Sequence, residues 1–442
     1  QPLGPKLRNH LSVKPRVLTN HSKLNEILLH LTPHHFRISL YDNTCPQRGN
    51  DRYLFVYKLI KSTGLNIGDF VNDSTTENKA KSNIIKKVAR YNGALSKKQQ
   101  LLFRAFVKSC VHRIRGPFLA RHTPGEVLEA LETAFLYAWQ RKKGDVKVTI
   151  GPNKKNGLTI ISVMQDQPFI VDSTRLFLER NNADYLGGFN LVFNVVRDKK
   201  GFITGAGQEG LAESLMFLES NEGDLLEDID TAIIRLTKNL KLARAAVHDF
   251  ETMTQCVTDV ATTLHKNAEE TAKFLQWLVQ ENFVFMGITQ GDKDYGIQTI
   301  EGPYKGDING DWPASNEFGI QVRKTACESP VHRAGRIDEI RVTHPTKTNE
   351  VLLYIRGMFT YRAVTQPSRH VPILRQVVSN LLIESETAPG SYQYKGIGNV
   401  FDSLPTEFLL TATVSSIYRM VNLVIDSEQQ KEVGATFIPT GT

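Results

Sequence analysis

The chain has 442 residues and a mass of 49.7 kDa, with near-average shares of apolar (40%) and charged (23%) residues. Its length predicts about three domains of the usual ~100–200 residues, and its composition excludes a disordered, collagen-like or disulfide-scaffold protein. The net charge of +8 is uneven, because residues 1–121 contain 22 Lys and Arg against 6 Asp and Glu. Such basic segments often contact nucleic acid, anionic lipid or an acidic protein surface.

The cysteines and the hydropathy pattern exclude two further classes of protein. The four cysteines lie dozens of residues apart without a C-x-x-C pair, so neither a zinc ribbon nor a redox dithiol is predicted, and a reduced, cytoplasmic protein is expected. No stretch approaches the ~18–20 apolar residues of a membrane span, and the first residues do not contain the apolar h-region of a signal peptide. We therefore expect no membrane contact, and a chain that is either processed or a piece of a longer polypeptide.

Residues 1–145 are predicted to form a basic N-terminal arm followed by a helical or mixed domain. Within the proline-interrupted arm, Ser22–Leu31 is predicted to be a helix and Arg52–Ile60 a strand. Residues 79–121 have a basic helical pattern, and Thr123 and Glu126 predict a capped helix start around Pro124. His30, His34 and His35 do not predict a metal site, because Pro33 breaks the helical spacing that would align them.

Residues 146–252 show the clearest pattern, in the order strand, helix, strand, strand, helix, after a first short strand. This order is typical of a ferredoxin-like α+β unit, an antiparallel sheet covered on one side by helices. The continuous apolar run Leu158–Val163 predicts a strand buried on both faces. The other predicted segments are Val146–Ile150, Phe189–Arg197 and Ser214–Leu218 as strands, a helix that includes Ile170–Phe177, and the long helix Asp224–Val247.

Residues 253–282 are predicted to be a helical connector and residues 283–442 a second α+β domain. Asn267 is placed to cap the second connector helix. The predicted helices are Thr254–His265, Glu269–Gln280, Val371–Ile383 and, after a glycine-rich passage, Glu407–Ile425. The predicted strands are Phe283–Thr289, Phe318–Arg323, Ile337–Val342 and Val351–Met358.

The segment from Gly205 to Gly210 matches the G-x-G-x-x-G pattern of dinucleotide-binding loops. That pattern needs a buried parallel strand before it and a helix after it. Here a hairpin arm precedes the glycines and residues 212–218 read as a strand, so a surface turn is favoured over a nucleotide site.

Two segments are candidates for binding an anion, although no Ser/His/Asp set, Cys/His set or P-loop can be assembled and no catalytic residue is predicted. Residues 166–173 lie where a buried strand leads into a helix, and free amides at a helix start attract carboxylates. The alternative is that Asp166 only caps the helix while Phe169 packs beneath it. His332 and Arg333 form the second segment, for which a solvated arginine surface is the alternative.

These segments resemble a known family. Residues 166–173 (DQPFIVDS) resemble the D-x-P-F-[LI]-V-D-S signature in the N-terminal half of the large bacterial NAD-specific glutamate dehydrogenases. Further blocks follow in the family's order and spread the resemblance over residues ~105–430. They are AKFLQWL at 272–278, NFVFMG at 282–287, SPVHR at 329–333, GMFT at 357–360, ILR at 373–375 and DSLPTEF at 402–408.

The resemblance implies tandem ACT-like (ferredoxin-like) and PAS-like domains with helical connectors, in a subunit several times longer than this chain. It implies an N-terminal regulatory and oligomer-forming fragment of an enzyme that oxidises L-glutamate to 2-oxoglutarate with NAD. We expect the fragment alone to be inactive, to contain neither cofactor nor metal, and to form homo-oligomers. NAD is expected in the parent enzyme.

The resemblance also implies an amino-acid effector, for which the candidate residues are Asp166, Pro168, Phe169, Asp172, Ser173, His332 and Arg333. ACT modules typically have a glycine at the turn where this chain has Phe169, which favours a packing role for that turn. A polyanion- or nucleic-acid-binding protein that uses residues 79–121 is the alternative function. Few aromatic residues interleave those lysines, so base stacking, and with it nucleic acid, is not favoured.

Overall fold

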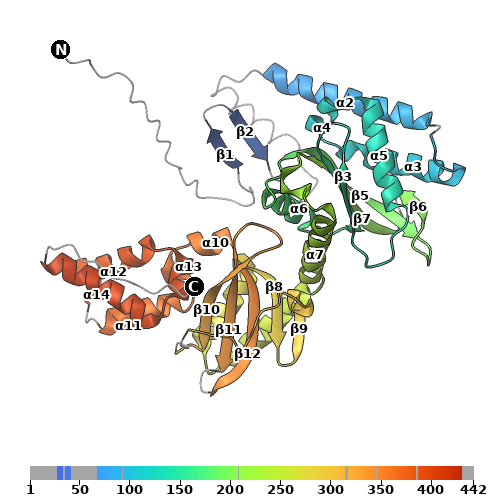
Figure 1. The fold of residues 1–442 in the computed structure, drawn as a ribbon. Coiled ribbons are helices and arrows are strands. Elements are labelled where there is room, and N and C mark those ends of the chain that lie inside the picture. Colours follow the sequence, from blue (N-terminus) through green and yellow to red (C-terminus); the bar gives the residue numbers. More distant parts are fainter. Residues whose placement is uncertain are drawn as a thin grey trace, which may run out of the picture. The chain divides into compact units, whose positions relative to one another are not determined.

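The computed structural model describes residues 27–32, 35–40, 67–91, 93–207, 209–313, 317–344, 347–384 and 387–430. The chain divides into two compact units, residues 1–72 and 73–442 (Figure 1).

The first unit contains the antiparallel hairpin β1 (Ile27–Thr32) and β2 (His35–Leu40). The predicted helix Ser22–Leu31 is therefore wrong over residues 27–31. Short apolar runs are ambiguous between helix and strand, and pairing with β2 decides this one. The predicted strand Arg52–Ile60 lies outside the described residues.

A layer of helices opens the second unit. In α5 the predicted cap is confirmed, because the Thr123 hydroxyl accepts from the Glu126 amide (3.3 Å) and the Glu126 carboxylate accepts from the Thr123 amide (2.7 Å). This reciprocal pair satisfies two amides that helix geometry leaves without partners. The helices of this layer are α2 (Ile67–Ala89, which begins in the first unit), α3 (Lys97–Cys110), α4 (Gly116–Arg121) and α5 (Pro124–Ala138).

The first sheet is antiparallel, with the strand order β3-β4-β7-β5-β6. The predicted order of strands and helices is confirmed, and β4, α6, β5, β7 and α7 follow the βαββα succession of a ferredoxin-like unit. The preceding strand β3 pairs with β4 at one edge. The elements are β3 (Lys147–Pro152), β4 (Leu158–Gln165), α6 (Ile170–Glu179), β5 (Tyr185–Arg197), β6 (Ile203–Gly207), β7 (Leu211–Ser220) and α7 (Ile229–His248).

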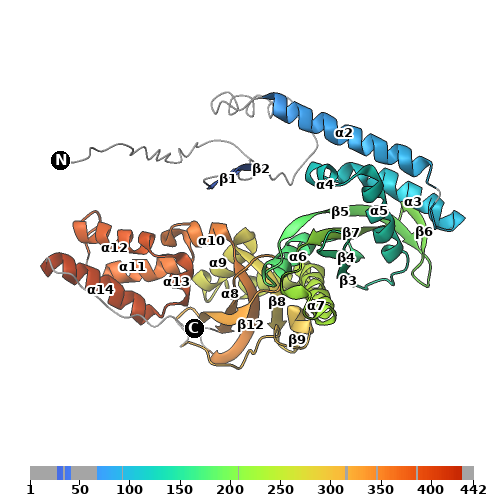
Figure 2. The same ribbon diagram turned by 45° about the horizontal axis from the view of Figure 1, so that its top comes forward.

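Helices cover both faces of this sheet (Figure 2). Residues of α2–α5 share one core with alternate residues of the strands, and residues of α6 and α7 share a second core on the opposite face. The expected one-sided cover is therefore wrong, because the basic helices have apolar faces that need burial. The two-sided burial predicted for Leu158–Val163 is confirmed.

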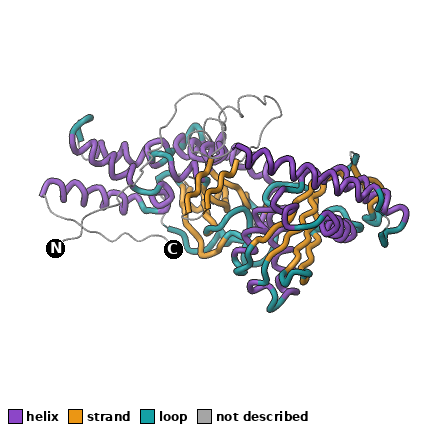
Figure 3. Tube along the Cα trace, turned by 90° about the horizontal axis from the view of Figure 1, so that it is seen from above, coloured by secondary structure: helices purple, strands orange, loops and turns teal. Residues whose placement is uncertain are grey.

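A second antiparallel sheet follows, with the order β10-β11-β12-β8-β9. Helices α8 and α9 pack on it in a core that also includes the C-terminal helices. In Figure 3 the two sheets appear as separate groups of orange strands with purple helices alongside. The elements are α8 (Phe250–Leu264), α9 (Glu269–Trp277), a π-helical turn (Leu278–Asn282), β8 (Phe283–Gln290), β9 (Lys293–Gly296), β10 (Ile320–Glu328), β11 (Arg336–His344) and β12 (Lys347–Phe359).

The C-terminal part is helical. The predicted cap Asn267 is wrong, because Ala268 is at the cap position of α9 and makes no side-chain bond. The glycine-rich passage forms α12, and the predicted helix Glu407–Ile425 is two helices with extended backbone at Ala412 between them. The helices are α10 (Tyr361–Thr365), α11 (Leu374–Glu384), α12 (Tyr392–Ser403), α13 (Thr406–Thr411) and α14 (Val414–Gln430).

Candidate functional site

The turn between β4 and α6 contains the first group of predicted site residues. Asp166 extends the strand pairing, since its amide donates to the Ala212 carbonyl (3.0 Å), and burial raises the pKa of its carboxyl. Asp166 does not cap α6. The cap position belongs to Phe169, which makes no side-chain cap bond and whose carbonyl accepts from the Ser173 amide (3.0 Å).

Phe169 has the left-handed backbone conformation, with φ 70° and ψ 4°. Glycine adopts this conformation without steric cost, whereas a residue with a Cβ pays for it. The turn therefore has the backbone shape of a glycine turn but carries a phenyl ring. That ring joins a cluster of apolar side chains from α7, β8, β11 and β12.

The structure brings the second predicted segment to this turn. The His332 amide donates to the Ser173 hydroxyl (3.3 Å), and the rings of His332 and Phe169 meet edge to face with centroids 4.8 Å apart. His332 is also left-handed, with φ 68°. Burial, with the Arg333 charge as a smaller cause, lowers the pKa of its imidazole, which favours the neutral ring.

The other candidates are dispersed around this contact. Arg333 turns toward β12 and donates to the Phe359 carbonyl (2.7 Å). Asp172 is exposed in the first turn of α6 and acts on His332 only through its charge. The site is thus a joint between the two sheet domains, made by Phe169, Ser173 and His332. An ion pair between Arg180 and Glu328 (3.0 Å) adds a second link.

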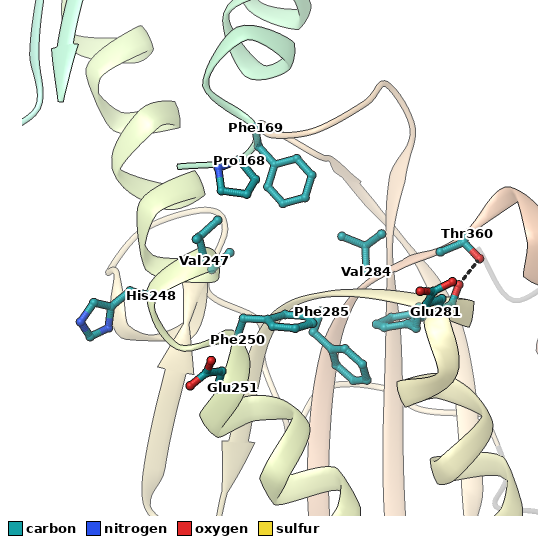
Figure 4. Close-up of a pocket in the computed structure, with 12 residues that line it drawn as sticks. Pro168, Phe169, Val247, His248, Phe250, Glu251, Glu281, Val284, Phe285 and Thr360 are labelled. Carbon is teal, nitrogen blue, oxygen red and sulfur yellow. Dashed lines mark hydrogen bonds between the residues drawn. The ribbon is translucent and has the colours of Figure 1, made fainter. Parts of the chain in front are cut away.

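A cavity of about 650 Å³ lies on the other side of Phe169 (Figure 4). Pro168 and Phe169 face Val247, Val284 and Phe250 across it. The remaining lining residues come from the end of α7, the start of α8, the π-helical turn, β8 and the segment before α10. They are Ala246, His248, Glu251, Glu281, Phe283, Phe285 and Thr360.

A second strained residue lines the same cavity. Glu281, the next-to-last residue of the π-helical turn, has φ 63°, and the Thr360 hydroxyl donates to its carbonyl (2.9 Å). The Thr360 amide donates to the neighbouring Asn282 carbonyl (3.0 Å). Left-handed residues other than glycine and asparagine are unusual and cluster at ligand sites and switch regions. Phe169 and Glu281 at the cavity, with His332 in contact with Phe169, mark this joint as the candidate site.

Sequence reasoning missed the aromatic wall formed by Phe250, Phe283 and Phe285. Two of these rings lie in the block at 282–287 and Thr360 lies in the block at 357–360, so the resemblance pointed to the segments without indicating a cavity. Their convergence depends on β8 and β12 pairing, with Phe359 opposite Phe283. Distances along the chain do not reveal that pairing.

The glycine pattern from Gly205 to Gly210 does not fit a nucleotide. It lies where β6 leads into β7, in an antiparallel sheet. A Cβ on Gly210 would meet the Val195 carbonyl oxygen at 2.2 Å, so that glycine serves close backbone packing. The prediction of a turn is confirmed, and NAD has no phosphate-binding loop here.

The described part of the chain contains neither a metal-binding cluster nor a membrane-spanning helix. No group of three or more His, Cys, Asp or Glu side chains there is arranged to hold a metal ion. Among the same residues, no helix combines the length and apolar character needed to cross a bilayer.

Comparison with known proteins agrees with this architecture. Residues 106–233 match the family model described as glutamate dehydrogenase, ACT1 domain, and residues 371–430 match glutamate dehydrogenase, helical motif 1. The chain is 25% identical over 321 residues to the NAD-specific glutamate dehydrogenase of Halomonas elongata. It is related to the NAD-specific glutamate dehydrogenases.

The matches correspond to structural elements. The ACT1 match begins within α3 and ends within α7, so it includes the sheet, α6 and helices on the opposite face. The helical motif match covers α11 to α14. The aligned region covers 62% of this chain and 20% of the Halomonas glutamate dehydrogenase. The chain thus corresponds to a fifth of that protein's length.

Proposed function

We propose that this chain is a regulatory, non-catalytic part of an NAD-dependent glutamate dehydrogenase, which as a whole converts L-glutamate and NAD to 2-oxoglutarate, ammonium and NADH. The observation that carries the proposal is the joint between the two sheet domains. The ACT1 match and the name of the Halomonas relative support the choice of enzyme. The joint lies between two segments, around Phe169 and His332, that the family resemblance singled out.

The geometry of the joint suits a two-state element. Left-handed backbone at Phe169 and His332 costs of order 1–3 kcal/mol at each residue and persists only while neighbouring contacts hold it. The contacts across the domains include one hydrogen bond and one ring pair, and the Phe169 ring also packs in the shared apolar cluster. A ligand or assembly step that breaks them would release the strain and bias the domain arrangement.

We further propose that the domain of β8–β12 is PAS-like. Its first and last strands, β8 and β12, lie next to each other within the sheet, and helices pack against one face. That order is the one expected of a PAS-like sheet. An effector in either domain would then act on the other through the joint.

Two measurements test the regulatory role. The purified chain, incubated with L-glutamate and NAD, should produce no NADH absorbance above that of a heat-denatured sample. Turnover by the chain alone would contradict the proposal that the chain is a non-catalytic part.

The second measurement uses the whole dehydrogenase that contains this chain. There, His332→Gly should change the KM or the cooperativity for glutamate while NAD binding is kept. Unaltered kinetics in that variant would exclude the joint from regulation.

A further inference from the structure

The walls of the cavity at the joint are aromatic on several sides. Phe169 comes from the turn before α6, Phe250 from the start of α8, and Phe283 and Phe285 from β8. Figure 4 shows Phe169 on one side of the space with Phe250 and Phe285 opposite. Phenyl rings pack well against hydrocarbon groups, and the negative partial charge on their faces attracts organic cations.

The charged side chains on the cavity have one sign. Glu251 and Glu281 line it, and no lysine or arginine is among the described residues that do. Arg362 approaches the Glu281 carboxylate to 3.6 Å from outside, but both side chains are mostly exposed, so the pair is weak. His248 is largely exposed and bonds Asp249 (2.8 Å). The charged groups that line the cavity are therefore acidic, and both are exposed to solvent.

From this arrangement we infer that the cavity binds a small organic cation, a primary amine attached to an apolar or aromatic body. The inference deepens the proposed function and rests on it, because such a ligand would occupy the regulatory joint and contact Phe169. A volume of about 650 Å³ lies within the usual range for small-molecule sites, ~300–1,000 Å³. Dianionic molecules such as 2-oxoglutarate, the oxidation product of glutamate, are disfavoured by the same two carboxylates.

Three probes with nearly the same body and different charge test the ligand class by calorimetric titration of the whole chain. They are 2-phenylethylamine (cation), 2-phenylethanol (neutral) and 3-phenylpropionate (anion). We expect the amine to bind with a dissociation constant on the order of 1 mM, as suits a ligand of about nine heavy atoms. The alcohol should bind about two- to fivefold more weakly and the anion weaker still.

Matched variants locate the site. Glu251→Gln and Glu281→Gln should each weaken amine binding about two- to fivefold and leave the alcohol unchanged. Asp292→Asn removes an exposed carboxylate in the β8–β9 turn, outside the cavity lining, and should leave both ligands unchanged. Val284→Phe should weaken binding of all three probes by filling the space.

The inference is overturned if the anion binds as tightly as the amine, or if no probe binds saturably to folded protein. It is also overturned if a variant that combines Glu251→Gln with Glu281→Gln binds the amine as tightly as the unaltered chain. These outcomes are separate from the proposed function, which is judged by turnover and by the kinetics of the joint variant. Binding of the amine with no effect on enzyme kinetics would support the site and contradict regulation through it.

Discussion

At the scale of single residues, the most informative is Phe169. Its backbone is left-handed, yet it carries a large side chain that contacts His332 on one side and lines the cavity on the other. At this position the strained backbone destabilises the folded state and the packed ring stabilises it. Substitutions can therefore separate the two contributions to the free energy of unfolding.

We expect Phe169→Gly to be more stable than Phe169→Ala by about 1 kcal/mol, because both lose the ring and only glycine is free of the left-handed penalty. Urea unfolding measures the difference. Ala130→Gly in the middle of α5, where glycine should cost about 1 kcal/mol, is the control for ordinary helical backbone. Equal stability of the two Phe169 variants would argue against the left-handed backbone.

Asp338 on β11 is a buried carboxyl in the second sheet. Lys324 lies 2.9 Å away and also pairs with Glu407 of α13, and the Phe359 amide donates to Asp338 (3.1 Å). Burial raises the pKa of Asp338 to about 6, against the attraction of Lys324. Since the folded pKa is above the unfolded one, the folded state binds the proton more tightly between those values.

The contribution of Asp338 to the free energy of unfolding should therefore fall as pH rises from about 4 to 6, by at most about 3 kcal/mol. Asp338→Asn keeps an acceptor for the Phe359 amide and removes the titration. Chemical unfolding at several pH values should show a flatter pH dependence for this variant than for the unaltered chain. An identical slope would show that Asp338 does not titrate in this range.

At the scale of elements, one side chain of α9 makes several polar contacts with the start of the helical motif, in addition to the apolar core that the motif shares with the second sheet domain. The Glu270 carboxylate accepts two bonds from the Arg375 guanidinium (2.9 and 2.6 Å) and one from the Ile373 amide (3.3 Å). Ile373 is left-handed, with φ 74°, and directly precedes α11. The Arg375 bond is the main cause that lowers the pKa of Glu270, so the ionised form is the one that fastens α11.

Glu270→Gln should destabilise the docking of α11 by about 1–2 kcal/mol, because the carboxylate charge and one of the two oxygens that accept from Arg375 are lost. Hydrogen exchange of α11 amides should accelerate while those of β11 stay protected. Glu269→Gln, one residue earlier and mostly exposed, is the matched control and should have little effect. Equal acceleration of α11 exchange in both variants would show that the effect comes from a change in α9 and not from the loss of the Glu270 contacts with Ile373 and Arg375.

At the scale of the whole molecule, exposed apolar side chains favour association between copies. Tyr361, Ile383 and Tyr392 are each exposed by more than 70% in helices of the C-terminal part. Exposed large apolar residues that gather on one part of a protein often belong to an interface. We propose that this part contributes to a homo-oligomer.

Light scattering should give a mass above 49.7 kDa at micromolar concentration, and the double variant Ile383→Glu with Tyr392→Glu should lower it. Circular dichroism checks that the variant stays folded. A monomeric mass for the unaltered chain contradicts the proposal.

Sequence reasoning recovered most elements in the region of the two sheets. Strands such as Leu158–Val163 and the capped start of α5 depend on local patterns, periodicity and hydrogen-bonding side chains within a few residues. It failed where residues outside the local segment decide the secondary structure. Residues 27–31 were predicted to be helical, but they form a strand because they pair with β2. It also missed the second helical layer on the first sheet.

For the site, the sequence indicated the right segments but not their relation. The residues around Phe169 and His332 were singled out separately, as two anion sites, and the structure makes them one joint. The left-handed backbone at both positions could not be read from Phe and His, which seldom adopt it.

The sequence by itself determined the α+β class, the succession of strands and helices and the family relationship, because these depend on local spacing and on collinear motifs. Only the tertiary structure decided that residues 169, 173 and 332 meet, that helices cover both faces of the first sheet, and that rings from three segments enclose a cavity with acidic residues. Such contacts join residues from dozens to more than a hundred positions apart, and tertiary packing selects them.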